Sequence, residues 1–469
     1  MVFSSITFLL YFMPVFFLVY YSLPYKFKNY WLVFASLLFY SWGAPVFIFA
    51  FLLSSILDYL ATTQFNKSNG KVYFVLAIVS NILLLGYFKY SNFFIDNFNV
   101  ISNTLFGSTI PWAHVILPIG ISFLTFEKIS YLIDVYRKDG GAQGNYLNYL
   151  LFVILFPHQI AGPIVRYKDV SEQIQNRAGN INLNGVYEGL LRFIIGLGKK
   201  VLLANVLGSQ VAIIFAVPVS ELTFTTVWVG IIAYTFQIYF DFSGYSDMAI
   251  GIGKMLGFKF PENFKFPYSS RSITEFWKRW HMTLGNWMKD YLYIPLGGNR
   301  GNSTYINLMI VFLLSGLRHG ASWNFVLWGA VHGSFLVIER IYLNKMLQRI
   351  NPAIANMYTF LIVASAWVLF RSEDISYALI YLKKMYSIPL IDLDYLVSLN
   401  PKLFLVISIG FVFAFASEKM QLLLTRIYTQ SSSNKTANYL IGFTAISLYI
   451  LALGELLATG FNPFIYFKF

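Results

Sequence analysis

Long apolar segments alternate with short polar segments along the whole chain, and this pattern predicts a polytopic helical membrane protein. Several apolar segments approach the roughly 20 residues that a helix needs to cross a bilayer. The candidate spans are residues 5–22, 31–46, 46–60, 71–90, 114–133, 147–162, 185–217, 221–240, 242–257, 303–317, 321–342, 355–370, 402–418 and 438–457. Because some of them are short or are interrupted by Gly, Pro or a charge, we expect about 11 true crossings together with re-entrant helices.

The most polar long segment, residues 258–302, is too charged to cross lipid. Either Ser270 or Ser272 is placed to cap a helix over 273–293, with Glu275 as the capping partner. The apolar face of that helix consists of Phe276, Trp280, Leu284 and Trp287. We expect this amphipathic helix to lie in the membrane plane on the cytoplasmic side, or to plug the interior of the protein.

The composition supports a membrane protein without a large soluble domain. The chain is 57% hydrophobic and only 12% charged, whereas soluble domains carry about 25% charged residues. The absence of Cys excludes disulfides and thiolate chemistry. The net charge of +13 needs no nucleic acid, because the basic residues lie between apolar segments, where cytoplasmic loops and lipid headgroups favour them.

The distribution of basic residues predicts the orientation of the chain. Lys26 and Lys28 follow the first apolar segment, and no Lys or Arg precedes it. The loop at 419–437, before the last apolar segment, is also basic. Because basic loops stay in the cytoplasm, we expect both termini to be extracytoplasmic and the number of crossings to be odd.

Two histidines lie in the apolar segment "SGLRHGASWNFVLWGAVHG" at 315–333. A titratable group inside a membrane segment indicates a functional site, although a lone His in an apolar helix is often structural. We expect His319 to line a cavity, because small residues around it leave room for a substrate or another backbone. The expected wall of that cavity consists of Gly316, Gly320, Ala321, Trp323, Asn324 and Trp328.

The sequence gives weaker evidence of a functional role for the other histidines. His332 lies 13 residues after His319 and therefore on another helix face, which excludes a two-His metal helix and favours a packing role. His281, beside Trp280 and one turn from Trp277, is either an interfacial residue or a second polar group at the cavity of His319. The two remaining histidines are expected in loops or at the interface: His114 and His158.

Two carboxylates interrupt the apolar segment at 236–257. Asp241 and Asp247 are six residues apart, which places them on different helix faces and argues against a paired-carboxylate dyad. We expect them to bind Arg279 or Lys278 and so to orient the helix that holds His281. The further candidates for the cavity are Asp241, Ser243, Tyr245, Trp277 and Trp280. The sequence shows no metal-binding or nucleotide-binding motif.

Several of these segments together resemble the membrane-bound O-acyltransferase family, in the bacterial branch that contains the alginate and peptidoglycan O-acetyltransferases. The resemblance rests on "LPIGISFLTFEKISYLIDVYR", "FPHQIAGPIVRY", "FDFSGYSDMAIGIGKMLGFKFPENFKFPYSSRSITEFWKRWHMTLGNWMKDYLYIPLGGNRG", "HGASWNFVLWGAVHG" and the ending "GFNPFIYFKF". It covers the chain from about residue 110 onward, whereas the first 110 residues match only in hydropathy.

The resemblance implies an all-α fold in which the transmembrane helices form a ring around a central funnel. It implies that His319 is the principal catalytic histidine and His281 the second histidine of the core. The 469 residues then form one integral-membrane domain, with N-terminal helices (1–110), a catalytic core (111–345) and C-terminal helices (346–469).

By the same resemblance, the enzyme resides in the bacterial cytoplasmic membrane and needs no bound cofactor or metal. It takes an acetyl group from acetyl-CoA or an acyl carrier in the cytoplasm. An extracytoplasmic acetyltransferase partner helps to deliver that group to an exported polysaccharide, such as an alginate-like polymer or peptidoglycan. A related branch transfers D-alanine to teichoic acids, which remains an alternative.

One departure from the family pattern concerns the residue before the catalytic histidine. Relatives usually carry Trp there, whereas this chain carries Arg318. A cation beside the imidazole disfavours its protonated form or binds an anionic donor or acceptor. Two further alternatives are a polysaccharide export channel and a scaffold for an extracytoplasmic enzyme. A transporter predicts paired repeats, which the sequence lacks, and a scaffold needs no imidazole in its core.

Overall fold

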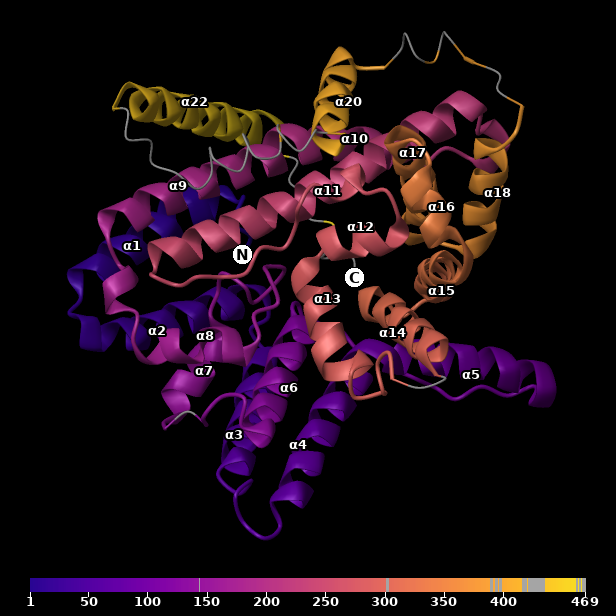
Figure 1. The fold of residues 1–469 in the computed structure, drawn as a ribbon. Coiled ribbons are helices and arrows are strands. Elements are labelled where there is room, and N and C mark those ends of the chain that lie inside the picture. The colour runs from indigo at the N-terminus through magenta and orange to yellow at the C-terminus, as the bar shows by residue number, and fades with distance from the viewer. Residues whose placement is uncertain are drawn as a thin grey trace.

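The computed structural model describes residues 1–142, 144–300, 303–388, 391–392, 395, 399–415, 420, 435–460, 463 and 465. Within these residues the regular structure is helical, and none of them belongs to a strand (Figure 1). The expectation of an all-α fold is therefore confirmed. The basic loop at 419–437 lies almost entirely outside the described residues.

The N-terminal half consists mainly of helices joined by short connections. Its elements are η1 (Phe8–Phe12), α1 (Met13–Ser22), α2 (Tyr25–Gly43), α3 (Phe47–Thr62), α4 (Gly70–Leu85), η2 (Gly86–Tyr90), α5 (Ser91–Phe106), α6 (Ile121–Arg137), α7 (Tyr146–Ile154), α8 (Tyr167–Gln175), η3 (Ala178–Asn180), α9 (Leu183–Gly198), η4 (Lys199–Ala204), α10 (Asn205–Ile214) and η5 (Val219–Glu221).

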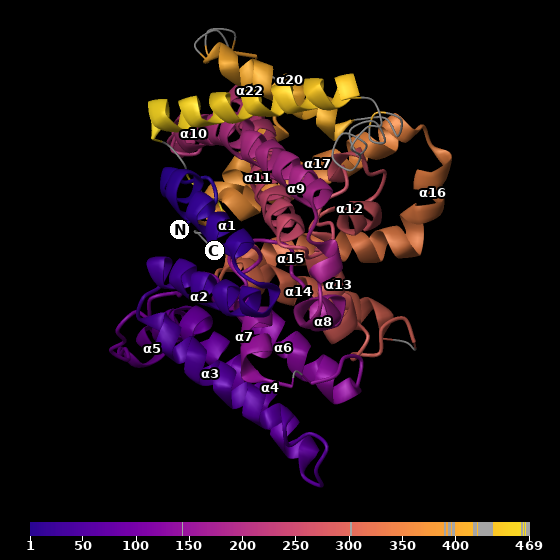
Figure 2. The ribbon, with the colours of Figure 1, turned by 90° about the vertical axis from the view of Figure 1, so that its left-hand side faces the viewer.

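The second half begins with a long central helix that runs through the core. Its elements are α11 (Phe224–Met255), η6 (Pro267–Ser269), α12 (Ile273–Arg279), α13 (Met282–Met288), η7 (Lys289–Tyr293), α14 (Thr304–His319), α15 (Trp323–Ile338), η8 (Glu339–Leu343), α16 (Asn344–Arg349), α17 (Pro352–Arg371), α18 (Ile375–Met385), α20 (Pro401–Ala414) and α22 (Lys435–Thr459). Figure 2 shows α9 lying along α11, with α22 crossing beside them.

Glycine allows α9 and α11 to pack backbone against backbone. A Cβ added at Gly196 would lie 2.5 Å from the carbonyl oxygen of Gly244, and one added at Gly189 would lie 2.6 Å from that of Gly251. The two glycines on each helix are seven residues apart, so they fall on one face of the helix. We call this close contact the α9–α11 seam; it fixes α11 in the core.

A second close helix pair, α14 with α15, positions His319. A Cβ added at Gly316 would lie 2.1 Å from the carbonyl oxygen of Phe325, and one added at Gly329 would lie 2.3 Å from that of Phe312. The small residues expected to leave room near His319 therefore admit a neighbouring backbone. Because α14 ends at His319, this contact sets the position of the imidazole.

The polar segment at 258–302 folds into the protein as a broken helix. Ser272 caps α12 by accepting a hydrogen bond from the Glu275 amide (3.0 Å), as expected. The expectation of one continuous helix over 273–293 is wrong, because the chain leaves the helical conformation at Trp280 and His281. His281 adopts a left-handed conformation (φ 44°) in which its side chain reaches Asn263. All four apolar-face residues are buried nonetheless: Phe276, Trp280, Leu284 and Trp287.

Several of the described helices are long and apolar enough to cross a bilayer. They comprise Gly70–Phe106, Trp323–Arg349, Pro352–Arg371 and Tyr439–Thr459. Shorter apolar helices are Phe8–Ser22, Phe47–Thr62 and Pro401–Phe413. Many of their large apolar side chains are exposed, as lipid-facing residues require. The chain is therefore a multi-pass membrane protein.

Candidate active site

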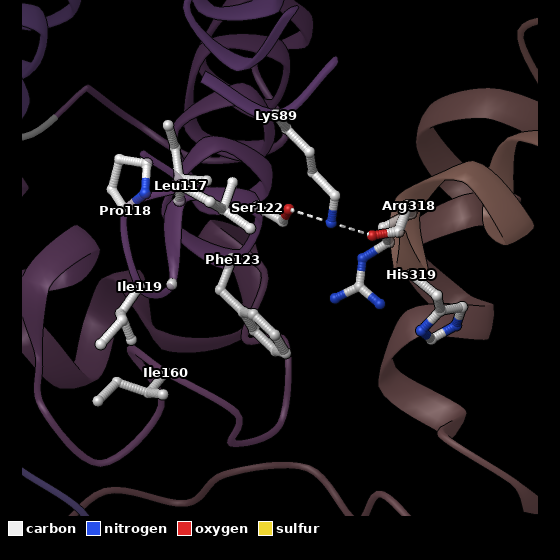
Figure 3. A pocket seen from close by; sticks show the side chains of 11 residues that line it. Lys89, Leu117, Pro118, Ile119, Ser122, Phe123, Ile160, Arg318 and His319 are labelled. Carbon is white, nitrogen blue, oxygen red and sulfur yellow. Dashed lines mark hydrogen bonds between the residues drawn. The ribbon is translucent and has the colours of Figure 1, made fainter. Parts of the chain in front are cut away.

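A cavity of about 110 Å³ reaches the end of α14 (Figure 3). His319 and Arg318 line one side of it. The opposite side consists of Lys89 from η2, the start of α6 and the loop before it, and Ile160. Apart from Lys89, Ser122, Arg318 and His319, the lining side chains are apolar, so the polar groups of the cavity gather around His319.

Arg318 and Lys89 form the cationic part of the lining. The guanidinium of Arg318 lies over the rings of Phe123 and Phe126, 4.9 and 5.0 Å from their centroids. The Lys89 ammonium donates to Ser122 Oγ (3.2 Å) and to the carbonyl oxygen of Arg318. These contacts tie η2 and α6 to the end of α14.

Trp328 forms an aromatic wall beside His319. The two rings meet edge to face with centroids 5.2 Å apart, and Phe370 packs against both. Trp328 is fully buried, and its Nε1–H has no hydrogen-bond partner among the described residues. A buried N–H donor without a partner is unfavourable, and Trp328 does not itself line the cavity.

His281 is held by Asn263 in one defined tautomer. The Asn263 Oδ1 atom accepts a bond from Thr283 Oγ1 (2.8 Å) and lies 2.9 Å from His281 Nδ1. The Asn263 amide nitrogen donates to Ser246 (2.9 Å). Because Asn263 Oδ1 is an acceptor, His281 Nδ1 carries the proton and Nε2 has the free lone pair. Within the described part of the chain, Nε2 has no hydrogen-bond partner.

A second, larger cavity ends at Asn263. It measures about 370 Å³ and lies between α9, α11 and the segment 262–266. Ser243 lines it together with Tyr239 and Ser246. Asn263 also binds His281, so this cavity ends beside the side chain that holds His281. The first cavity ends at the other histidine, His319.

Burial determines the protonation state of His281. Burial lowers the pKa of His281 well below its usual range, and the neighbouring charges of Arg318 and His319 lower it further. Both imidazoles are buried, with about 1% of His281 and 5% of His319 exposed. His281 lines neither cavity, so its expected place at the cavity of His319 stays a prediction. Because its pKa is lowered, the His281 imidazole is neutral at physiological pH.

Comparison with known proteins decides the family. The sequence profile of the membrane-bound O-acyltransferase family matches residues 141–371, a range that contains both His281 and His319. The probable alginate O-acetylase of Azotobacter vinelandii is 44% identical over 386 residues, which cover 81% of this chain and 76% of that protein. The chain belongs to the membrane-bound O-acyltransferase family.

Two further relatives define the range of the similarity. The peptidoglycan O-acetyltransferase of Helicobacter pylori is 36% identical over 435 residues, covering 84% of this chain and 82% of that protein. The teichoic acid D-alanyltransferase of Streptococcus thermophilus is 31% identical over 246 residues, covering 48% and 58%. The resemblance stated from the sequence is thus confirmed, and the protein is an O-acyltransferase.

No residue of the wall expected around His319 in this O-acyltransferase lines either cavity, and three of the expected cavity residues lie clearly elsewhere. Trp323 is 54% exposed and donates to Asn97 Oδ1 (2.9 Å), because it lies at the outer end of α15. Asn324 donates to the carbonyl oxygen of Ser372 (2.8 Å) and joins α15 to the end of α17. Tyr245 stacks on Phe3 in the N-terminal core. Their positions explain why none of them lines either cavity.

The aspartates of α11 bind other partners than expected. Asp241 pairs with Lys200 (2.5 Å) and accepts a bond from the backbone N–H of Ile465 (3.0 Å). Asp247 pairs with Arg192 (2.9 Å) and Lys199 (2.7 Å). The expected link to Arg279 or Lys278 is wrong, since Arg279 pairs with Glu275 on its own helix. The partners come from α9 and η4 because the α9–α11 seam brings those elements to α11.

Trp277 of α12 and Trp280, the residue that follows α12, lie close to the histidines without lining the cavity of His319. The Trp277 Nε1–H donates to His332 Nδ1 (3.3 Å), and the Trp277 ring meets Trp328 edge to face. Trp280 packs against Trp367. His332, enclosed by these rings and fully buried, occupies the packing position expected of it.

The last two histidines differ from each other. His114 is exposed in a loop near Asp96, as expected. His158 also lies in a loop, as expected, but it is buried and binds Glu127 (2.6 Å). The loop at 155–166 folds into the core instead of running over the surface, because its neighbours Phe156, Gln159 and Ile160 are buried as well.

Lys89 and Asn263 were not among the predicted site residues. Lys89 is a lone cation at the end of an apolar segment, and an intramembrane charge indicates a functional site. That signal was present in the sequence. Asn263 lies in the polar segment "PENFKF", where nothing distinguishes it from its neighbours. Only the fold shows that it supports His281.

Proposed function

We propose that this O-acyltransferase transfers an acetyl group from a cytoplasmic thioester donor for O-acetylation of an exported polysaccharide. The names of the relatives from A. vinelandii and H. pylori support acetyl transfer to alginate or peptidoglycan, because both match about four-fifths of the chain. The match to a teichoic acid D-alanyltransferase covers less than half of it, which makes D-alanyl transfer the weaker alternative.

The observation that carries the proposal is the pairing of a buried imidazole with a buried N–H donor. His319 lies at the cavity, and Trp328 Nε1–H beside it lacks a partner among the described residues. Acyl transfer from a thioester needs a base for the incoming hydroxyl and a donor for the developing oxyanion. His319 supplies the base and Trp328 supplies the donor.

The reaction follows from these two groups. The hydroxyl oxygen of the acceptor attacks the thioester carbonyl carbon while His319 takes the hydroxyl proton. The C–S bond then breaks, and His319 returns the proton to the leaving sulfur. The transfer uses the energy of the thioester, so this step needs no ATP, metal or bound cofactor.

His281 has a separate role in the proposal. Holding the thioester carbonyl would require an N–H donor. With Nδ1–H directed to Asn263, Nε2 is an acceptor. We assign His281 to accept a hydrogen bond from a hydroxyl or amide group of the donor or the acceptor, thereby orienting it toward His319.

The membrane arrangement belongs to the same proposal. We place the enzyme in the bacterial cytoplasmic membrane, with about 11 crossings around a funnel and both termini extracytoplasmic. The segment 258–302 lies on the cytoplasmic side, so the cavity at Asn263 admits acetyl-CoA or an acyl carrier. The cavity at His319 faces the acceptor and an extracytoplasmic acetyltransferase partner. Reporter fusions that place residue 469 in the cytoplasm would overturn this orientation.

The decisive experiment is transfer of labelled acetyl from acetyl-CoA by the purified full-length protein. His319→Ala should lower the rate by about 10²–10⁴ while leaving the unfolding midpoint nearly unchanged. The exposed His114 offers a matched control, and His114→Ala should transfer at the wild-type rate. Near-normal transfer by a well-folded His319→Ala protein would refute the mechanism and shift attention to His281.

A further inference from the structure

A buried carboxylate joins the end of α15 to the start of α12. Glu339, the residue that follows α15, is 2% exposed and lies in an apolar segment long enough to cross a bilayer. Its carboxylate accepts hydrogen bonds from the backbone N–H groups of Ile273 (2.6 Å) and Thr274 (2.9 Å), and from Thr274 Oγ1 (2.7 Å). A carboxylate in such a position is costly unless donors compensate it, and α12 supplies three.

The local sequence caps α12 without the help of Glu339. Ser272 Oγ accepts a bond from the amide of Glu275 (3.0 Å), and Glu275 Oε2 accepts one from the amide of Arg271 (2.8 Å). This reciprocal pair is a form of capping box, which begins a helix from neighbouring residues alone. Glu339 takes the first two N–H groups of the helix, which this pair leaves open. Its contribution is therefore a contact between two helices.

A second contact joins the same two helices one turn further along α12. The Trp277 Nε1–H donates to His332 Nδ1 (3.3 Å). Thr274 and Trp277 are three residues apart, and His332 and Glu339 are seven residues apart, so each pair lies on one side of its helix. We call these two contacts the α12–α15 clamp. Figure 2 shows α12 beside the second half of α15.

The clamp joins two elements that carry groups of the proposed reaction. On α15, the Trp328 ring meets His319 edge to face, with centroids 5.2 Å apart. On α12, the Trp277 ring meets Trp328 in the same way, at 5.6 Å. The chain reaches His281 two residues after α12 ends. A change in the distance between α12 and α15 therefore moves Trp277 and His281 relative to Trp328 and His319.

We propose that Glu339 is a positioning residue for acyl transfer, which holds α12 against α15 and so aligns His281 and Trp277 with Trp328 and His319. Glu339 lines neither of the two cavities described above, so it acts through α12 and not on the substrate. The inference rests on the proposed function, because His319-dependent transfer is the reaction that this alignment serves.

The first test measures acetyl transfer by the purified full-length protein, well below its unfolding midpoint. Glu339→Ala should lower kcat about 10²-fold, the effect of a misplacement of about 1 Å. Because the variant loses alignment and not binding, kcat/KM should fall by the same factor and KM should stay unchanged. Glu339→Gln keeps one acceptor oxygen, so its kcat should lie between the two, at least about tenfold above that of Glu339→Ala.

Glu275→Gln is the matched control, because it weakens the capping of the same helix. The partners of Glu275 are Arg271 and Arg279, neither of which belongs to α15. This variant should lower the unfolding midpoint and keep the wild-type kcat. A residue with a merely structural role at this end of α12 would affect only the unfolding midpoint.

A second test is independent of catalysis. The chain contains no Cys, so Lys278→Cys on α12 and Tyr342→Cys on η8 provide a unique pair of sites for spin labels. Both positions are exposed. The distance distribution between the labels should shift or broaden in Glu339→Ala, because α12 is released from α15, and should stay unchanged in Glu275→Gln.

The inference is overturned if folded Glu339→Ala keeps the wild-type kcat or the wild-type label distance, or if Glu275→Gln lowers kcat as far as Glu339→Ala does. If Glu339→Ala fails to fold, Glu339→Gln decides, and wild-type values of kcat and label distance overturn the inference. The His319→Ala assay tests the proposed function separately. His319-dependent transfer at the wild-type kcat in Glu339→Ala would overturn only the role of Glu339.

Discussion

The substitution Gly316→Ala tests whether the contact between α14 and α15 sets the position of the catalytic base. The added Cβ would lie 2.1 Å from the carbonyl oxygen of Phe325, 3.0 Å from its carbonyl carbon and 3.4 Å from the Cα of Gly329. All three atoms belong to the backbone of α15, so no side chain can rotate away. Since Cβ contacts below 3.0 Å essentially never occur, the two helices must separate by nearly 1 Å.

That separation has an effect on stability and an effect on rate. Overpacking of this kind costs about 1–3 kcal/mol of folding free energy. His319 lies one turn after Gly316, so the imidazole moves with the helix. A misplacement of about 1 Å lowers an enzymatic rate about 10²-fold, which corresponds to about 2.7 kcal/mol of transition-state stabilisation.

The assay combines acetyl transfer with thermal unfolding of the same purified sample. Gly454→Ala is the matched control, because its Cβ meets nothing within 4 Å and α22 lies away from the site. The control should keep the wild-type rate and gain about 0.4–1 kcal/mol of stability. If Gly316→Ala transfers acetyl as fast as Gly454→Ala and is equally stable, the argument that α15 positions His319 is refuted.

Three further predictions address the site and its support. Trp328→Phe, which keeps a ring but removes the N–H, should lower the transfer rate about 10²–10³-fold. Trp323→Phe is the control, and equal rates in the two variants would contradict the assignment of Trp328 as oxyanion donor. Asp241→Asn should destabilise the protein by about 3–5 kcal/mol because it removes the carboxylate that pairs with Lys200. Lys200→Met in the same chain should restore most of the unfolding midpoint, and additive losses would argue against the pair. Below pH of about 6.5 His281 is protonated in the unfolded chain but not in the folded chain, because folding lowers the pKa of its imidazole. The free energy of unfolding therefore decreases as the pH is lowered. Melting curves from pH 8 to pH 5 should show this slope reduced in His281→Gln, and equal slopes would show that His281 does not titrate in this way.

Local patterns predicted those parts of the molecule that depend on neighbouring residues. Hydropathy predicted the helices, and the serine cap with Glu275 predicted the start of α12. The small residues around His319 correctly indicated a close approach, although they admit the backbone of α15 rather than a substrate. These features follow from helix geometry and side-chain size, which the sequence displays directly.

Features that depend on distant residues were beyond such reasoning. The partners of Asp241 and Asp247 follow from the α9–α11 seam, and the sequence does not show which helix lies beside α11. The break at His281 depends on a hydrogen bond to Asn263, 18 residues earlier. Trp323 and Asn324 were assigned to the cavity from proximity in sequence alone, whereas the turn of the helix directs them to Asn97 and Ser372.

The ion pairs along the α9–α11 seam also govern how the chain enters the bilayer. Arg192, Lys199 and Lys200 are synthesised before Asp241 and Asp247, which neutralise them in the finished protein. Until α11 leaves the ribosome, α9 and η4 carry three cations that lipid disfavours strongly. By itself, α9 is therefore disfavoured as a membrane segment. It is favoured in the membrane only when α11 lies beside it. We therefore expect α9 and α11 to enter the membrane together, because the carboxylates that neutralise α9 and η4 come from α11.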